Sequence, residues 1–129
     1  MLVRPSVRTV SSAFSVEIMG LQVAEHGSDA CVVTVTGEVD VVTAPDLAVC
    51  LTAQLTTTQV VVVDLDGVRF LGSAGLSVLF EANELATHRG RNLRLVSHSR
   101  AANLALMVTG LTSCFTFAES VPDALSGAL

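Results

Sequence analysis

The stretch Val60-Val-Val-Val-Asp-Leu-Asp-Gly-Val-Arg-Phe-Leu-Gly-Ser-Ala-Gly-Leu76 carries the strongest structural signal in this chain. Its unbroken row of valines predicts a strand over residues 59–65 that is buried on both faces, as in a parallel or mixed sheet under helices. A turn is expected after this strand, and a helix is expected to begin near Ser73. A helix N-terminus offers unpaired N–H groups and a positive dipole end, so Ser73 is well placed to carry an anionic group.

The composition predicts a single globular domain. The chain has 129 residues, of which 50% are hydrophobic, and this is enough for one core. Residues 1–16 lack a clear period and are expected to be a flexible N-terminal extension of a domain at 17–129. No apolar run reaches the roughly 18 residues of a transmembrane helix, so the cytoplasm is the expected location. The net charge of −5 argues against direct binding of nucleic acid.

The cysteines and the missing lysines limit the chemistry that the chain can perform. Cys31, Cys50 and Cys114 are widely spaced, and we interpret them as reduced thiols in the core. A redox switch through one disulfide remains open as an alternative. Neither the cysteines nor the histidines show the spacing of metal ligands. Since the chain has no lysine, the phosphate-binding loop G-x-x-x-x-G-K-[S/T] is absent. We therefore expect no metal, no cofactor and no ATP hydrolysis.

The pattern of apolar residues and helix caps predicts alternating strands and helices. A hairpin of strands at 21–24 and 31–36 comes first, and a helix capped by Thr43, with Asp46 in the capping-box position, follows it. The helix that begins near Ser73 is expected to end at Gly90, with Phe80 on its apolar face. Later elements are a strand at 92–97, a helix at 100–109 capped by Ser99, a strand at 114–117 and a helix opened by Ser120. The order β-β-α-β-α-β-α-β-α predicts an α/β domain with a mixed central sheet.

Two segments of the sequence resemble the signatures of the STAS domain. Gly37-Glu-Val-Asp40 followed by Thr43-Ala-Pro-Asp-Leu47 is similar to the first signature, and residues 61–76 are similar to the second. The resemblance covers roughly residues 20–127. The group that it resembles most is the bacterial anti-sigma factor antagonists, also called anti-anti-sigma factors.

The resemblance implies a partner-switching function. An unmodified antagonist would bind an anti-sigma factor that is itself a serine kinase, so that a sigma factor is released. Phosphorylation of Ser73 by that kinase would break the complex, and a phosphatase would restore it. The implied partner-binding residues are Asp40, Gly72, Ser73, Ala74 and Gly75. The family often has an aspartate where this chain has Gly72, and a serine or threonine where it has Ala74.

Two other functions compete with this interpretation. STAS domains also serve as stressosome-like scaffolds and as small subunits of lipid-transport ATPase complexes, where phosphorylation of Ser73 would not be the control. The segment Gly72-Ser-Ala-Gly75 superficially resembles the nucleophile elbow of a hydrolase, but Leu71 stands where the first glycine of G-x-S-x-G is required. The sequence therefore predicts a binding protein that is not an enzyme.

Overall fold

The computed structural model describes residues 7–10 and 18–126, which form one mixed sheet with helices on both faces. The strands lie in the order β1-β2-β3-β4-β5-β6, with β1, β2 and β3 antiparallel and β3 to β6 parallel. In chain order the elements are β1 (Val7–Val10), β2 (Met19–His26), β3 (Ala30–Val39), α1 (Ala44–Thr57), β4 (Val60–Leu71), α2 (Ser73–His88), β5 (Asn92–Val96), α3 (Arg100–Val108), the short 3-10 helix η1 (Thr112–Cys114), β6 (Thr116–Phe117) and α4 (Val121–Leu125). The predicted α/β class and the order from β2 onward are confirmed.

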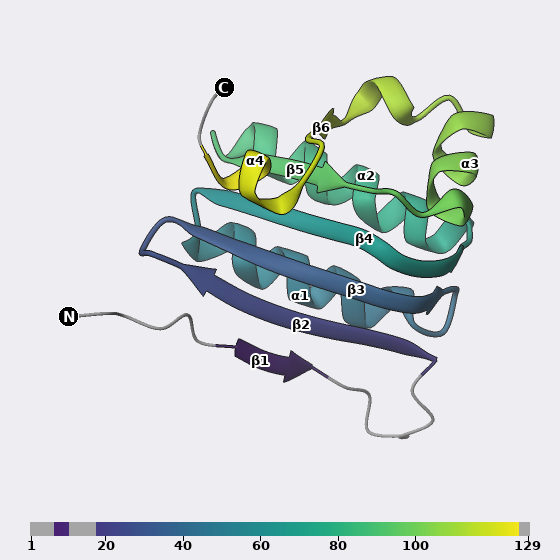
Figure 1. The fold of residues 1–129 in the computed structure, drawn as a ribbon, viewed down its shortest axis with the longest axis horizontal. Coiled ribbons are helices and arrows are strands. Elements are labelled where there is room, and N and C mark those ends of the chain that lie inside the picture. Colours follow the sequence, from purple (N-terminus) through teal and green to yellow (C-terminus); the bar gives the residue numbers. More distant parts are fainter. Residues whose placement is uncertain (1–6, 11–17, 127–129) are drawn as a thin grey trace.

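The segment 1–16, predicted to be a flexible extension, contains a strand. β1 pairs with β2 in antiparallel register, with Val7 opposite Ala24 and Val10 opposite Leu21. Residues 1–6 and 11–16 lie outside the described residues. The pairing places β1 at the edge of the same sheet as the rest of the domain (Figure 1).

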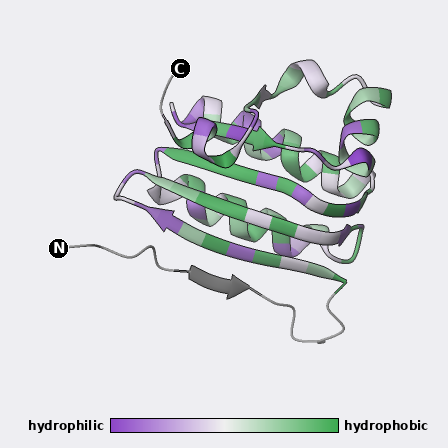
Figure 2. Cartoon of the chain, in the orientation of Figure 1, coloured by the Kyte–Doolittle hydropathy of each residue, from purple (hydrophilic) through white to green (hydrophobic). Residues whose placement is uncertain are grey.

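The row of valines in β4 is buried on both faces, as predicted. Val61 and Val63 belong to the main core, on the face covered by α1 and α2, whereas Val62 belongs to a smaller cluster under α4. Figure 1 shows α1 and α2 against one face of the sheet and α4 on the other. Helix α3 lies at the end where the parallel strands terminate. Figure 2 shows that the first half of β4 is hydrophobic and that its second half is more polar.

Strand β4 does not end at residue 65 but runs on to Leu71, so the predicted turn is wrong. Its polar second half stays in the sheet because β3 pairs with it as far as Val39, which lies opposite Leu71. The register of the β3–β4 pair shifts between Thr34 and Thr36 and again after Gly37. Such shifts are typical of β-bulges, and the two strands remain paired beyond them. Hydrogen bonds to a neighbouring strand thus override the local preference for a turn.

One helix cap and two core assignments differ from the prediction. Ser99 and Ser120 cap α3 and α4 as predicted, accepting from Ala102 N at 3.0 Å and from Asp123 N at 3.2 Å. Thr43 occupies the N-cap position of α1 as predicted, but its side chain makes no cap bond to the helix. Phe80 is 38% exposed instead of buried, and Cys114 is exposed, whereas Cys31 and Cys50 are buried as expected.

Candidate functional site

The ends of β3 and β4 bring the two sequence motifs together. Both strands run in the same direction, and beyond their last pair the backbone N–H of Gly72 donates to Val39 O at 2.9 Å. The loop that follows β3 and the start of α2 therefore meet at one edge of the sheet, where ligands of open α/β sheets usually bind. An open hollow of about 340 Å³ lies between them, lined by Asp40, Val41, Phe70, Gly72, Ser73, Ala74 and Ser77.

Ser73 is exposed and is the first helical residue of α2. The N-cap is Gly72, whose extended backbone (φ −86°, ψ 178°) carries no side chain that could satisfy the first N–H groups of the helix. The first turn of α2 also has no acidic residue. The positive end of this helix is consequently open to a negative group, and the Ser73 hydroxyl lies directly at it.

Asp40 organises the loop between β3 and α1. Its Oδ1 accepts from the backbone N–H groups of Val42 at 2.9 Å and Thr43 at 3.0 Å, while Thr43 Oγ1 accepts from Asp40 N at 2.9 Å. This reciprocal pair is a capping arrangement one turn ahead of α1, and Asp40 O also accepts from Ala44 N at 2.8 Å. Asp40 is thus both a cap acid and a residue of the hollow, and the Thr43 hydroxyl serves this loop.

The same bonds lower the pKa of the Asp40 carboxyl. The largest cause is the backbone N–H of Thr43, and the N–H of Val42 adds to it, because both favour the ionised form. A folded-state pKa below the unfolded value means that the carboxylate stabilises the folded loop above the unfolded pKa. This contribution disappears as the pH falls through the lower, folded pKa.

We expect Asp40→Asn to lower the melting temperature at pH 7, because the neutral amide is a weaker acceptor for the two N–H groups. The gap in melting temperature between the wild type and Asp40→Asn should begin to narrow below about pH 4, the pKa of an unfolded aspartate, and should close as the pH falls through the lower pKa of the folded carboxyl. Circular dichroism melts at pH 7 and pH 3 measure this gap. The control is Asp29→Asn, which removes a charge from the exposed hairpin turn, and a gap as large in this control would contradict the role of Asp40.

The glycines beside Ser73 have different structural roles. Gly75 is buried, and a Cβ there would lie 2.6 Å from Val39 Cγ1, so its missing side chain lets α2 pack closely on β3. Gly72 lies in the hollow next to the ring of Phe70. Ala74 is half-buried and packs on the main core. The structure therefore places Gly72, Ser73 and Ala74 at the hollow together with Asp40, and it places Gly75 beneath them.

Sequence reasoning missed three residues of the hollow: Val41, Phe70 and Ser77. Phe70 was overlooked because the segment before Ser73 was predicted to be a turn. The available signal for Ser77 was its spacing, since a residue four positions after Ser73 lies on the same face of a helix.

A second hollow adjoins the first along α2. It has a volume of about 360 Å³ and is lined by Ser73, Leu76, Ser77, Phe80, Glu81 and Leu111. Ser73 and Ser77 line both hollows. The two serines therefore form a polar ridge between two partly apolar depressions.

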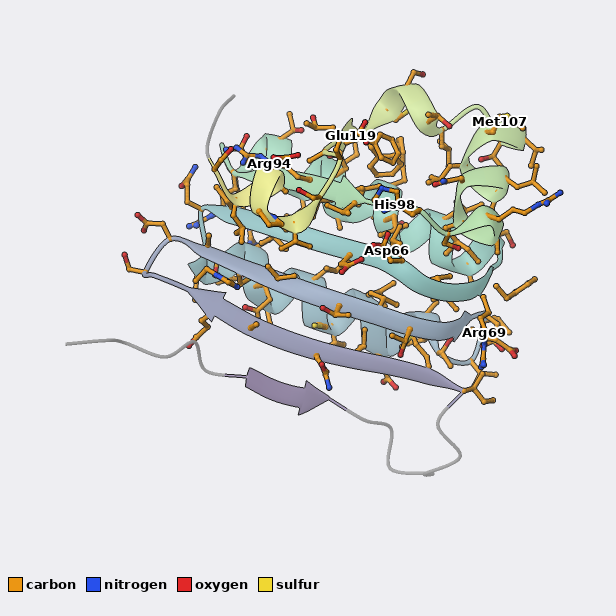
Figure 3. The ribbon with its side chains drawn as sticks, viewed as in Figure 1. Asp66, Arg69, Arg94, His98, Met107 and Glu119 are labelled. Carbon is orange, nitrogen blue, oxygen red and sulfur yellow. The ribbon has the colours of Figure 1, made fainter. Side chains whose placement is uncertain are left out.

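Within residues 7–10 and 18–126, no cluster of three or more His, Cys, Asp or Glu side chains is arranged to hold a metal ion. Asp66 and His98 point toward each other (Figure 3), with His98 Nδ1 3.0 Å from Asp66 Oδ1, but neither residue lines the hollows. Among the helices described, none has both the length and the apolar character that crossing a membrane requires.

The fold and the site define a small mixed-sheet α/β domain with an exposed serine where a strand gives way to a helix. The STAS domain family model matches residues 21–124, and the chain belongs to this family. Anti-sigma-F factor antagonist RsfA of Mycobacterium tuberculosis is 30% identical over 105 residues, which cover 79% of this chain and 82% of RsfA.

Solved structures agree with this assignment. The crystal structure of an anti-sigma factor antagonist from Mycobacterium paratuberculosis has a TM-score of 0.75 and 32% identity, covering 90% of this chain and 96% of that one. The unphosphorylated form of the anti-sigma factor antagonist SpoIIAA has a TM-score of 0.69 at 13% identity, covering 81% of this chain and 91% of SpoIIAA, and it supports the fold alone. The resemblance to anti-sigma factor antagonists seen in the sequence motifs is confirmed.

Proposed function

We propose that this protein is an anti-sigma factor antagonist whose surface around Ser73 binds an anti-sigma factor, so that a sigma factor is released. The anti-sigma factor is a serine kinase that phosphorylates Ser73 and so ends the complex, and a phosphatase restores the free hydroxyl. The observation that carries the proposal is the position of Ser73, which is exposed at the start of α2 between two hollows with apolar lining. The function of its relatives supports the same partner class.

A phosphate on Ser73 is compatible with the folded domain. Phosphoserine carries about −1.5 to −2 charges at neutral pH, and a negative group at a helix N-terminus is favourable by roughly 0.3–1 kcal/mol. The first turn of α2 contains no acidic residue that would repel the phosphate. Phosphorylation of this serine therefore acts on the complex and leaves the fold intact.

The same phosphate opposes binding of a partner that covers the ridge. The phosphate would lie between two partly apolar hollows and would lose its hydration when the partner docks. An apolar partner surface offers no hydrogen bonds or charges to compensate for this loss. A loss of about 2.8 kcal/mol in binding free energy lowers the affinity about a hundredfold. One modified serine is thus sufficient for a switch.

The surroundings of Ser73 favour a binding function over hydrolysis. The residues that line the two hollows include no histidine that could act as a base for the serine. The carboxylate of Asp40 is engaged by the backbone N–H groups of its own loop. The protein is therefore proposed to be a regulator without catalytic activity. Its proposed location is the cytoplasm, and ATP is proposed to be a substrate of its partner.

Intact mass spectrometry tests this function. The purified protein is incubated with Mg-ATP and a candidate anti-sigma factor, beside Ser73→Ala and Ser77→Ala. We expect the mass of one phosphate to be added to the wild type and to Ser77→Ala but not to Ser73→Ala. Binding without phosphorylation would instead favour a STAS scaffold or a subunit of a stressosome-like or lipid-transport ATPase complex.

A further inference from the structure

Phe70 is a large aromatic side chain that the fold leaves exposed beside Ser73. It is the second-last residue of β4, and its side chain is 49% exposed. The nearest other apolar residues of the strand, Val68 and Leu71, are only 4% and 5% exposed. Val41, which lines the same hollow from the β3–α1 loop, is 76% exposed, and its neighbour Val42 is 74% exposed. Aromatic and β-branched side chains gathered in this way at a small hollow are typical of a protein contact.

The ring of Phe70 takes the space that any side chain at position 72 would need. A Cβ on Gly72 would lie 2.9 Å from Phe70 Cε2 and 3.2 Å from Cζ. The backbone of Gly72 is in an ordinary extended conformation (φ −86°), so its φ and ψ do not require glycine. Gly72 is therefore matched to the ring, and a methyl group there would push the ring aside without straining the backbone.

Apart from the Asp40 carboxylate, the hollow offers its partner an uncharged and largely apolar lining. Its carboxylate, on Asp40, is held by backbone N–H groups of the same loop, and its other lining side chains are uncharged. A partner side chain that packs on Phe70 consequently needs an apolar surface. The ring lies in the same hollow as Ser73, so this contact and the phosphate on Ser73 would exclude each other.

We propose that Phe70 is the anchor of the contact with the anti-sigma factor, and that Gly72 is required because it lets the ring lie across the start of α2. The anti-sigma factor packs an uncharged, apolar side chain against the ring and Val41. This inference rests on the proposed function and specifies the partner chemistry at the same site. Buried aromatic anchors near the centre of a contact commonly carry most of its binding energy.

Isothermal titration calorimetry with the unphosphorylated protein and its anti-sigma factor tests the anchor. Phe70→Ala should weaken binding by about 30-fold or more, the loss typical of an anchor residue. Leu104→Ala is the matched control, because Leu104 is equally exposed (50%) but lies on α3, and it should bind within about threefold of the wild type. Melting temperatures of both variants establish that they are folded.

A double-mutant cycle tests the link between Phe70 and Gly72. Gly72→Ala should weaken binding in the wild-type background and should have no further effect in Phe70→Ala, because the displaced ring is then absent. Equal effects of Gly72→Ala in both backgrounds would overturn the link. Undiminished binding by Phe70→Ala would overturn the anchor while leaving the proposed function intact, whereas a wild type that binds no anti-sigma factor would overturn both.

Discussion

Ser73→Glu is expected to bind the anti-sigma factor about 100-fold more weakly than the wild type while melting at nearly the same temperature. The carboxylate introduces a negative charge on the ridge between the two hollows, where the partner would have to desolvate it. The same charge lies at the N-terminus of α2, where the helix dipole favours it by up to about 1 kcal/mol. Binding and stability should therefore respond independently to this substitution.

Two variants serve as controls for the binding measurement. Ser73→Ala should bind as the wild type does and should stay bound in the presence of Mg-ATP, because it lacks the hydroxyl that accepts the phosphate. Ser28→Glu adds the same charge at the exposed hairpin turn and should leave the affinity unchanged. A marked loss of thermal stability in Ser73→Glu would contradict the dipole argument, and wild-type affinity would contradict the proposed binding surface.

Gly37→Ala is expected to destabilise the domain by roughly 3–5 kcal/mol, the largest effect that we expect on stability. Gly37 has φ +81°, a conformation that side chains rarely adopt, and a Cβ there would lie 2.1 Å from the carbonyl oxygen of Ile18. That oxygen also accepts a hydrogen bond from Glu38 N at 2.8 Å, so the methyl group would break the bond as well as displace β2. Because Ile18 O is a backbone atom, it cannot avoid the added methyl group by a change of side-chain rotamer.

Urea unfolding compares this variant with Gly27→Ala, its natural control. Gly27 also has a positive φ (+66°), but no atom lies within 4 Å of its missing Cβ. The control should therefore show only the conformational cost, about 1–2 kcal/mol. Equal destabilisation by the two substitutions would mean that φ alone decides the effect and that the contact with Ile18 O does not matter.

The sequence predicted the elements whose signals are local. The valines of β4 specified a strand buried on both faces, and Ser99 and Ser120 marked the starts of α3 and α4 through hydrogen bonds made within three residues. The start of α2 near Ser73 was identified from the helical spacing of the apolar residues that follow it. The domain class followed from the alternation of these elements.

The sequence misjudged the places where distant segments decide the outcome. Residues 66–71 were expected to form a turn, yet they form the second half of β4 because β3 supplies their hydrogen bonds. Thr43 is the N-cap residue of α1, but its hydroxyl bonds to Glu38 O at 3.0 Å, at the end of β3, instead of to the first turn of the helix. Phe80 keeps an apolar spacing on α2, yet part of its ring faces the second hollow.

Local patterns in the sequence specified the α/β class, the order of the elements from β2 onward and the position of Ser73 at the start of α2, since these depend on periodicity and on the preferences of near neighbours. The hollow that the Asp40 loop, Phe70 and Ser73 share arises from the packing of the whole domain. The parallel pairing of β3 with β4 brings together residues about 30 positions apart. The backbone hydrogen bonds of a helix are made within one segment, whereas those of a strand are made to another segment of the chain. No local pattern specifies which segment that is.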